Sequence, residues 1–314
     1  MQDSAPSNDF DERRGATQFH PSRFEDYRLV YPVVSRRAQG VSIGANLSPT
    51  KLCNFRCVYC QVARGERAEE IERALNVGAP VATPPLPVVA RFDAAALKRE
   101  ALQLGRAALD GALFETTRFA DVPDDRRVLR DFAFSGDGEP TLSPFFPQGV
   151  EALAQARDEL GCEAVKLVLI TNATRLTAPP IVEALDRMTQ ANGEIWAKLD
   201  GVDASSYRAA NRSLVPFETI LSNLRFAARR WGVKIQSALW RRGGEAPLFE
   251  NVDRYCALLT ELSSSGRVFA AQLYTVARAP AESDVEPLTN AEMDAFAARV
   301  REETGIPIEV FYSR

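Results

Sequence analysis

The stretch VKLVLITN, residues 165–172, is a short apolar run that ends in two polar residues, Thr171 and Asn172. A continuous apolar run of this length is typical of a strand covered on both faces, as in a parallel sheet. Segments 146–159 and 180–190, on either side of it, carry apolar residues at three- and four-residue spacing, which is typical of amphipathic helices. A strand between two such helices predicts a βα unit of an α/β fold.

The same alternation of strand and helix extends along the chain. Further runs of strand type are VSIGANL (41–47), DFAFS (131–135), EIWAKLD (194–200), VKIQSALW (233–240), VFAAQLYTV (268–276) and IPIEVF (306–311). Further helical patterns cover 94–108, 216–231, 249–263 and 290–304. Repeated units of this kind predict parallel βα units, too few for an eight-unit barrel. We therefore expect an α/β protein with a partial (β/α)6 TIM-like barrel, with a doubly wound open sheet as the alternative.

Segment boundaries follow from composition. Residues 1–20 are polar without periodicity, which predicts a disordered leader before one domain over 21–314. Residues 62–130 are interpreted as an elaboration between the first and second strands, with an extended Pro-rich part at 77–89. Glycines follow several helical patterns, where a C′ glycine is expected: Gly161, Gly193, Gly232, Gly266 and Gly305.

Composition limits the classes of protein that are possible. The chain has 314 residues, 46% of them hydrophobic, which is enough for a sizeable core. The formal net charge of −4 argues against a broad basic surface for nucleic acid. The sequence shows neither a long apolar span nor a secretory signal, so we expect a cytoplasmic protein with no membrane partner. The single histidine, His20, makes a hydrolytic metal site or a Ser-His-Asp triad a poor interpretation.

The segment Cys53-Asn-Phe-Arg-Cys57-Val-Tyr-Cys60 follows the first predicted strand and holds three of the five cysteines. Iron–sulfur clusters are usually held by four cysteine thiolates, so three thiolates leave one iron of a cubane open to another ligand. A zinc site is an alternative, and it would need Cys162, Cys256 or His20 as a distant fourth ligand. A further alternative is an electron-transfer cluster with a fourth cysteine.

The C-x3-C-x2-C spacing, with Tyr59 before the last cysteine, resembles the C-x3-C-x-Φ-C signature of the radical SAM superfamily, where Φ is aromatic. The resemblance implies one [4Fe–4S] cluster on Cys53, Cys57 and Cys60, whose open iron chelates S-adenosylmethionine (SAM). It also implies reductive cleavage of SAM to a 5′-deoxyadenosyl radical that abstracts hydrogen from a substrate. The protein then supplies binding and orientation around the cofactor.

The motif FSGDGEPTL (134–142) follows the second predicted strand and resembles the GGE(P) motif of the same superfamily. The resemblance implies that Gly136, Asp137, Gly138 and Glu139 bind the methionyl amino group of SAM, with a structural role as the other interpretation of Glu139. Asn172, with Thr171 beside it, is expected to contact the SAM ribose or carboxylate. An Asx-turn that leaves the strand is the alternative there.

Polar residues also mark the later strands. Lys198 and Asp200 are two residues apart and point to one face, so they could hold the SAM carboxylate or the substrate, or form a structural salt bridge. Arg278 is placed to meet an anionic substrate or the SAM carboxylate. Polar residues within apolar runs are further candidates for lining the pocket: Gln236, Ser237, Gln272 and Tyr274.

The resemblance covers residues 24–312 and is strongest to a bacterial group near the wyosine-synthase, tRNA-modifying branch that lacks a settled function. It implies a one-electron donor such as a flavodoxin or ferredoxin and a substrate that the sequence does not identify. tRNA is a possible but less favoured partner, because the further cysteines of the tRNA-modifying relatives are absent and the charge is acidic. A glycyl-radical activating enzyme and a non-catalytic Fe–S redox or binding protein remain as alternatives.

Overall fold

The computed structural model describes residues 27–47, 51–62, 92–280 and 282–313. Its strands are β1 (Val30–Ser35), β2 (Gly40–Ala45), β3 (Leu129–Phe134), β4 (Lys166–Thr171), β5 (Gly193–Lys198), β6 (Val233–Arg242), β7 (Val268–Thr275), β8 (Val285–Pro287) and β9 (Ile308–Phe311). Its α-helices are α2 (Ala94–Leu109), α3 (Phe146–Glu159), α4 (Pro179–Gln190), α5 (Ala204–Asn211), α6 (Phe217–Arg230), α7 (Val252–Ser265) and α8 (Asn290–Thr304). The predicted leader and the Pro-rich segment lie outside the described residues, and the division into domains stays a prediction.

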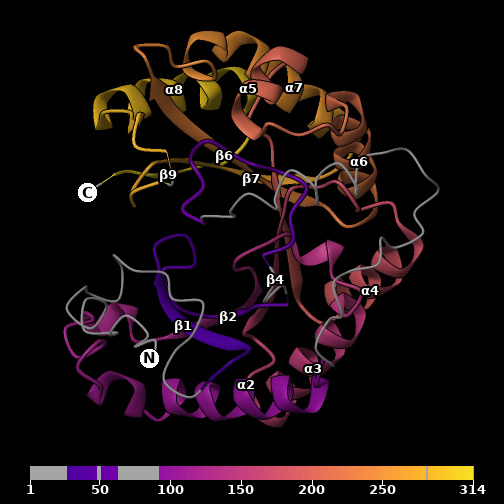
Figure 1. The fold of residues 1–314 in the computed structure, drawn as a ribbon, viewed down its shortest axis with the longest axis vertical. Coiled ribbons are helices and arrows are strands. Elements are labelled where there is room, and N and C mark those ends of the chain that lie inside the picture. Colours follow the sequence, from indigo (N-terminus) through magenta and orange to yellow (C-terminus); the bar gives the residue numbers. More distant parts are fainter. Residues whose placement is uncertain (1–26, 48–50, 63–91, 281, 314) are drawn as a thin grey trace, which may run out of the picture.

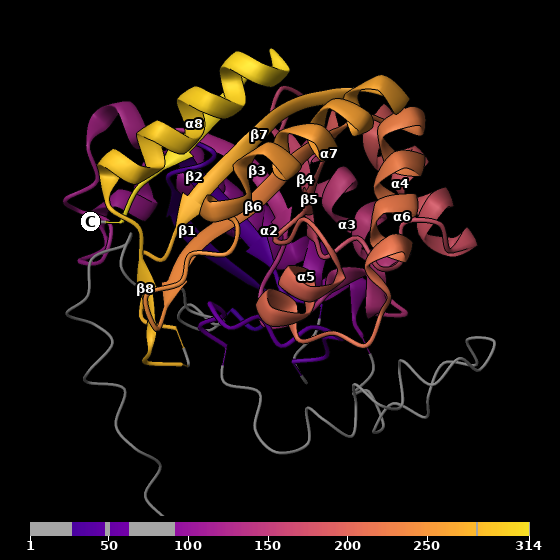
Figure 2. The ribbon, with the colours of Figure 1, turned by 90° about the horizontal axis from the view of Figure 1, so that it is seen from above.

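The main sheet confirms the partial barrel. Its strand order is β1-β2-β3-β4-β5-β6-β7-β9, and every neighbouring pair from β2 onward is parallel. A doubly wound sheet would reverse its strand order at a switch point, and this order runs on without a reversal. The sheet curls, with α2, α3, α4 and α6 to α8 along its outer side (Figure 1). Figure 2 shows the same arrangement from above.

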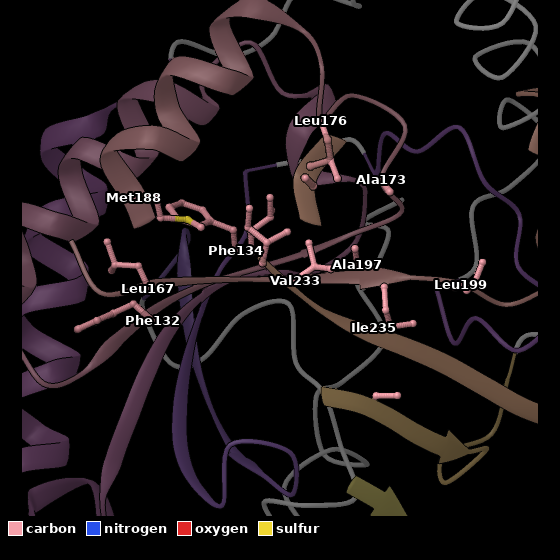
Figure 3. Close-up of a cluster of buried hydrophobic side chains, with 14 of the residues drawn as sticks. Phe132, Phe134, Leu167, Ala173, Leu176, Met188, Ala197, Leu199, Val233 and Ile235 are labelled. Carbon is pink, nitrogen blue, oxygen red and sulfur yellow. The ribbon is translucent and has the colours of Figure 1, made fainter. Parts of the chain in front are cut away.

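The outer face of the sheet carries the main hydrophobic core. Phe132 and Phe134 of β3 and Leu167 of β4 are fully buried against the helices. Figure 3 shows this cluster, in which Met188 of α4 packs over the strands. Burying one side chain of this size contributes about 1.5–3 kcal/mol, so the outer layer fixes the register of the strands. The alternate residues of the same strands then point toward the inside of the barrel.

Strand β1 was not predicted, and Pro32 within it is the reason. Proline has no backbone N–H and is therefore tolerated only in edge strands or at bulges. β1 pairs with β2 alone, in antiparallel register, and forms one edge of the sheet, while β9 forms the other. The hairpin turn between β1 and β2 reaches that other edge, because the guanidinium of Arg36 donates to the backbone oxygen of Tyr312.

Two of the five predicted C′ glycines have a different role. Gly161, Gly232 and Gly305 have positive φ as expected. Gly193 instead begins β5, where a Cβ would lie 2.4 Å from the carbonyl oxygen of Met188. Gly266 is extended, and a Cβ there would lie 2.3 Å from the backbone carbonyl carbon of Ala228 in α6. Both glycines are required by close packing of backbones rather than by a left-handed turn.

Helix α5 is a second element that was not predicted, and its eight residues are too short for a helical period to show. A capping box between Asp203 and Ser206 begins the helix. Gly201 lets the helix approach the end of β5, since a Cβ there would lie 2.5 Å from the backbone nitrogen and Cα of Tyr207. The last residue of the helix, Asn211, contacts the cysteine segment described below.

Gly201→Ala is expected to displace α5 and to destabilise the protein by about 1–3 kcal/mol, the usual cost of overpacking against backbone. Urea unfolding measures this loss. Gly149→Ala is the matched control, because its Cβ meets only side-chain ends, at 3.1–3.2 Å. Equal unfolding free energies for the two variants would contradict the assigned role of Gly201.

Candidate functional site

A cavity of about 320 Å³ lies inside the barrel, beneath the cysteine segment. Its upper wall is formed by that segment and by the residues that end β3 and β4. Its lower wall is formed by inward-pointing strand residues and by the β1–β2 hairpin turn. The residues that line the cavity include Arg37, Ser42, Cys53, Cys57, Tyr59, Cys60, Asp131, Gly136, Gly138, Glu139, Thr171, Asn172, Lys198, Tyr274 and Arg278.

Most of the residues predicted for the site are therefore brought together around one cavity. The exceptions are Asp137 and Asp200, which stand behind its wall and hydrogen-bond to other residues of the site. Of the polar strand residues, Tyr274 lines the cavity as expected. Gln236, Gln272 and Ser237 do not line it. Gln236 donates to Gln272, which donates to Glu309, and the Ser237 hydroxyl bonds the Leu199 oxygen and the Tyr255 hydroxyl.

Each of the three predicted iron ligands accepts a hydrogen bond from an N–H group. The backbone N–H of Phe55 donates to the Sγ of Cys53 at 3.4 Å, and that of Val62 donates to Cys60 at 3.4 Å. The Nδ2 of Asn211 donates to Cys57 at 3.2 Å. N–H donors stabilise negative charge on sulfur, which is the form that binds iron.

The Cys57 thiol would need a nearby positive charge to lose its proton. Burial raises its pKa to about 12, and the charges of Asp200 and Cys60 add to the effect. A cationic metal core compensates these repulsions, so the loop favours thiolates only together with such a core. The three sulfurs thus fit a metal cluster in their chemistry as well as in their hydrogen bonding.

Within the described part of the chain, no three His, Cys, Asp or Glu side chains gather as ligands of a single ion. The two remaining cysteines lie elsewhere: Cys162 bonds the Arg157 oxygen after α3, and Cys256 is buried in α7.

Glu139 fastens the glycine motif to the end of β4. Its carboxylate is buried and accepts hydrogen bonds from the Thr171 hydroxyl at 2.6 Å and the Asn172 N–H at 2.7 Å. It also accepts from the N–H and hydroxyl of Thr141. Burial raises the pKa of this carboxyl, and the hydrogen bonds oppose that effect. With both oxygens engaged inside the protein, the structural interpretation of Glu139 is the one that its contacts support.

The glycines of the same motif leave backbone exposed to the cavity. Gly136 has a φ of 125°, which other residues rarely adopt, and a Cβ there would meet the Asn46 side chain at 3.2–3.3 Å. The Asn46 amide also donates to Asp137 at 3.4 Å. The backbone groups of Gly136 and Gly138 are thus held at the cavity wall without a covering side chain.

Asn172 links the end of β4 to the cysteine segment. Its Nδ2 donates to Asn54 at 2.7 Å and approaches the Sγ of Cys53 at 3.9 Å, while its oxygen accepts from Thr174. The Asn172 side chain therefore makes the Asx-type turn given as the alternative above, and it also contacts the cysteine segment. The sequence analysis did not identify Asn54 as a site residue. Its position between Cys53 and Cys57 was the only signal for it.

Four polar residues form a connected set next to Cys57, and three of them line the cavity while Asp200 stands behind its wall. The Tyr59 hydroxyl donates to Asp200, and the ammonium of Lys198 donates to Tyr274. Asp200 also accepts from Asn211 at 3.2 Å and from a backbone N–H of β6 at 2.9 Å. Lys198 and Asp200 are thus joined through two tyrosines instead of by the predicted direct pair.

The charge of Lys198 faces the cavity. Burial alone would lower its pKa, but Tyr274 and Asp200 outweigh burial, and the pKa is raised. The ammonium lies 5.3 Å from the centre of the Tyr59 ring and 4.9 Å from that of Tyr274. Such cation–π contacts hold a charge in place while leaving it open to an anionic ligand.

The lower part of the cavity contains charged residues that sequence reasoning did not identify. Asp131, at the start of β3, accepts from the Ser42 hydroxyl at 2.5 Å. Burial raises the pKa of Asp131 to about 6, and its neighbour Glu194 adds to the effect. Arg37, from the β1–β2 turn, lies with its guanidinium 5.4 Å from the centre of the Tyr274 ring.

The strand order and the curled sheet define a partial α/β barrel, and solved structures share this fold. Among solved structures, the chain is similar to anSMEcpe with bound AdoMet, with a TM-score of 0.52 and 13% identity over 86% of this chain and 63% of that chain. It is also similar to archaeal TYW1, with a TM-score of 0.46 and 14% identity over 84% of this chain and 72% of that chain. At these identities the first likeness shows the fold alone.

Two curated relatives from Helicobacter pylori, both called UPF0026 protein, are each 24% identical to this chain. The match covers 190 residues in strain J99 and 182 in strain 26695, or 60% and 58% of this chain. It covers 47% and 45% of the relatives, so the chain spans about half the length of the curated relatives it matches. No family model matches the chain. These relatives fit the expected bacterial group without a settled function.

None of the helices in the described ranges has the length and apolar character needed to cross a membrane.

Glu139→Gln is expected to destabilise the fold by about 2–4 kcal/mol, because an amide nitrogen would face donors that now share a carboxylate. Thermal or urea unfolding of the apoprotein measures this loss of stability. Glu151→Gln, on the exposed side of α3, is the matched control and is expected to change stability by less than about 0.5 kcal/mol. A Glu139 variant as stable as the control would show that the motif is not fastened by this carboxylate.

Asp131 predicts a particular pH dependence of stability. The folded protein holds this proton up to about pH 6, whereas the unfolded chain releases it near the ordinary value of 3.8. Stability therefore falls across this window by up to about 1.4 kcal/mol per pH unit as the pH rises. Asp131→Asn removes this contribution, so the variant is expected to gain stability relative to the wild type between pH 4 and 6. Parallel pH profiles in urea unfolding would contradict the raised pKa.

Proposed function

We propose that this chain is a radical SAM enzyme that holds one [4Fe–4S] cluster on Cys53, Cys57 and Cys60. The observation that carries the proposal is the N–H hydrogen bond to each of the three sulfurs, at the mouth of a cavity lined by polar strand ends. The partial barrel shared with anSMEcpe supports it. When bound, the reduced cluster would deliver an electron to SAM, and the resulting 5′-deoxyadenosyl radical would abstract hydrogen from the substrate.

The chain's own residues would bind and orient SAM. The exposed backbone of Gly136 and Gly138 offers carbonyl groups for the methionyl amino group, with Glu139 and Asp137 holding that backbone in place. Lys198 offers a cation for the SAM carboxylate. Tyr59 would shape the wall beside the cluster.

Asn172 and Asp200 would then act mainly as positioning residues. Asn172 uses its amide to hold Asn54 in the cysteine segment, and Asp200 holds both Tyr59 and Asn211. Their predicted contacts with SAM remain part of the proposal. A one-electron donor such as a flavodoxin or ferredoxin would reduce the cluster, and the reaction would take place in the cytoplasm.

The proposal is tested by anaerobic reconstitution with iron and sulfide, followed by reduction with dithionite in the presence of SAM. The wild type is expected to form 5′-deoxyadenosine, and addition of SAM is expected to change the EPR spectrum of the reduced cluster. Cys57→Ser should bring both signals to background. Cys162→Ser, the matched control outside the cavity, should keep product formation within about two-fold of the wild type.

The EPR comparison separates the alternatives. A cluster with four protein ligands has no open iron, so its spectrum would stay unchanged when SAM is added. That result, together with the absence of 5′-deoxyadenosine, would favour a redox or binding protein and overturn the proposal. Salt-sensitive binding of tRNA would instead retain the radical chemistry and favour the tRNA-modifying alternative.

A further inference from the structure

We propose that Arg37 is the substrate-binding residue of this cavity and that the substrate is a small organic anion whose carboxylate or phosphate group binds its guanidinium. The inference rests on the proposed radical SAM function, because it assigns the substrate of that same cavity. It concerns a residue outside every motif discussed above, on the turn between β1 and β2.

The position of Arg37 is fixed by its neighbours on the chain. Arg36 donates to the backbone oxygen of Tyr312, which holds the hairpin turn against the end of β9. The turn therefore bridges the two edges of the open sheet, and Arg37 lines the cavity from there. A ligand in the lower half of the cavity would lie against this guanidinium.

The guanidinium is available to a ligand. Its contact in the described part of the chain is the face of Tyr274, at 5.4 Å, and no ion pair or hydrogen bond is found for it among those residues. An arginine carries its charge throughout the physiological pH range and presents a planar set of donors that fits a carboxylate or phosphate. A bound anion would accept hydrogen bonds from this half-buried guanidinium and balance its charge.

Asp131 lies near Arg37 and favours its charged form, but no ion pair joins the two among the described residues. Burial raises the pKa of Asp131, and the hydrogen bond from Ser42 and the charge of Arg37 oppose that effect without outweighing it. The other groups that face this carboxyl are Glu194, which raises its pKa, and Lys166, which lowers it. Glu194 is itself paired with Lys166 and Lys234.

Arg36, Lys198 and Arg278 also line the cavity, and Lys198 and Arg37 can be assigned to different ligands. Lys198 lies beside Tyr59 of the cysteine segment, where the carboxylate of SAM is proposed to bind. Arg37 comes from the hairpin turn, contacts the Tyr274 ring and lies near Asp131. Because the space is about 320 Å³, the substrate that reaches Arg37 is a small molecule or a small extruded group.

The test follows the reaction of Arg37 with phenylglyoxal, a reagent specific for arginine, in the reconstituted full chain with saturating SAM. Peptide mass spectrometry gives the rate at each arginine. Inorganic phosphate and acetate are the probes, and chloride at equal ionic strength is the reference. Arg130 is the internal control, because it is exposed on β3 and bonds the Gln39 oxygen of the same turn.

We expect saturating phosphate or acetate to slow the reaction of Arg37 at least about five-fold, since protection follows occupancy of the site, and to leave Arg130 unchanged. Protection by phosphate alone identifies a phosphorylated substrate, and protection by acetate alone identifies a carboxylate. Equal effects on Arg37 and Arg130 overturn the proposal. Protection by SAM without added anion also overturns it, because Arg37 would then bind the cofactor.

A second measurement does not depend on cluster chemistry. The protecting anion should raise the unfolding temperature of the wild type and of Arg130→Gln, and should leave that of Arg37→Gln unchanged. A shift retained in Arg37→Gln overturns the assignment. Failure of the radical SAM proposal would appear separately, as absence of 5′-deoxyadenosine with anion protection intact.

Discussion

The site depends on one buried carboxylate, that of Glu139. A buried charge is costly unless hydrogen bonds satisfy it, and here the end of β4 and the turn after the glycine motif supply them. The backbone N–H of Glu139 also donates to the Leu52 oxygen, next to Cys53. The glycine motif, β4 and the cysteine segment are thereby held as one unit. The backbone of the glycine motif thus owes its position to the buried side chain of Glu139.

The same arrangement recurs on the other side of the cavity with Asp200. It joins Tyr59 of the cysteine segment, Asn211 of α5 and a backbone N–H of β6. Asn211 in turn donates to Cys57, and the Asn211 oxygen accepts from the Arg56 N–H. The cysteine segment is therefore fixed from two walls, each through an acidic residue at a strand end, and Gly201 makes the second contact possible by admitting α5.

The sequence allowed prediction of those parts that repeat a local pattern. Parallel strands buried on both faces leave apolar runs, and polar residues that end them mark the cavity, as Asn172 does. β1 escaped prediction because Pro32 interrupts its pattern, although proline is compatible with an edge strand. α5 is too short to show a period, but the Asp203 and Ser206 capping pair after Gly201 was a usable signal. No local signal marks Arg37, because its place depends on the hairpin turn meeting the opposite edge of the sheet.

The charges of the cavity divide by sign in a way that suits a metal cluster and an anionic ligand together. Glu139 and Asp200 turn their charge into the walls, where neutral donors satisfy it. Lys198 and Arg37 instead rest on tyrosine rings and face the cavity. Thiolates would carry negative charge to the wall of this cavity, and the nearby cations would offset that charge. Aromatic rings hold these cations without cancelling them, so the positive potential stays available to the ligands that the cavity binds.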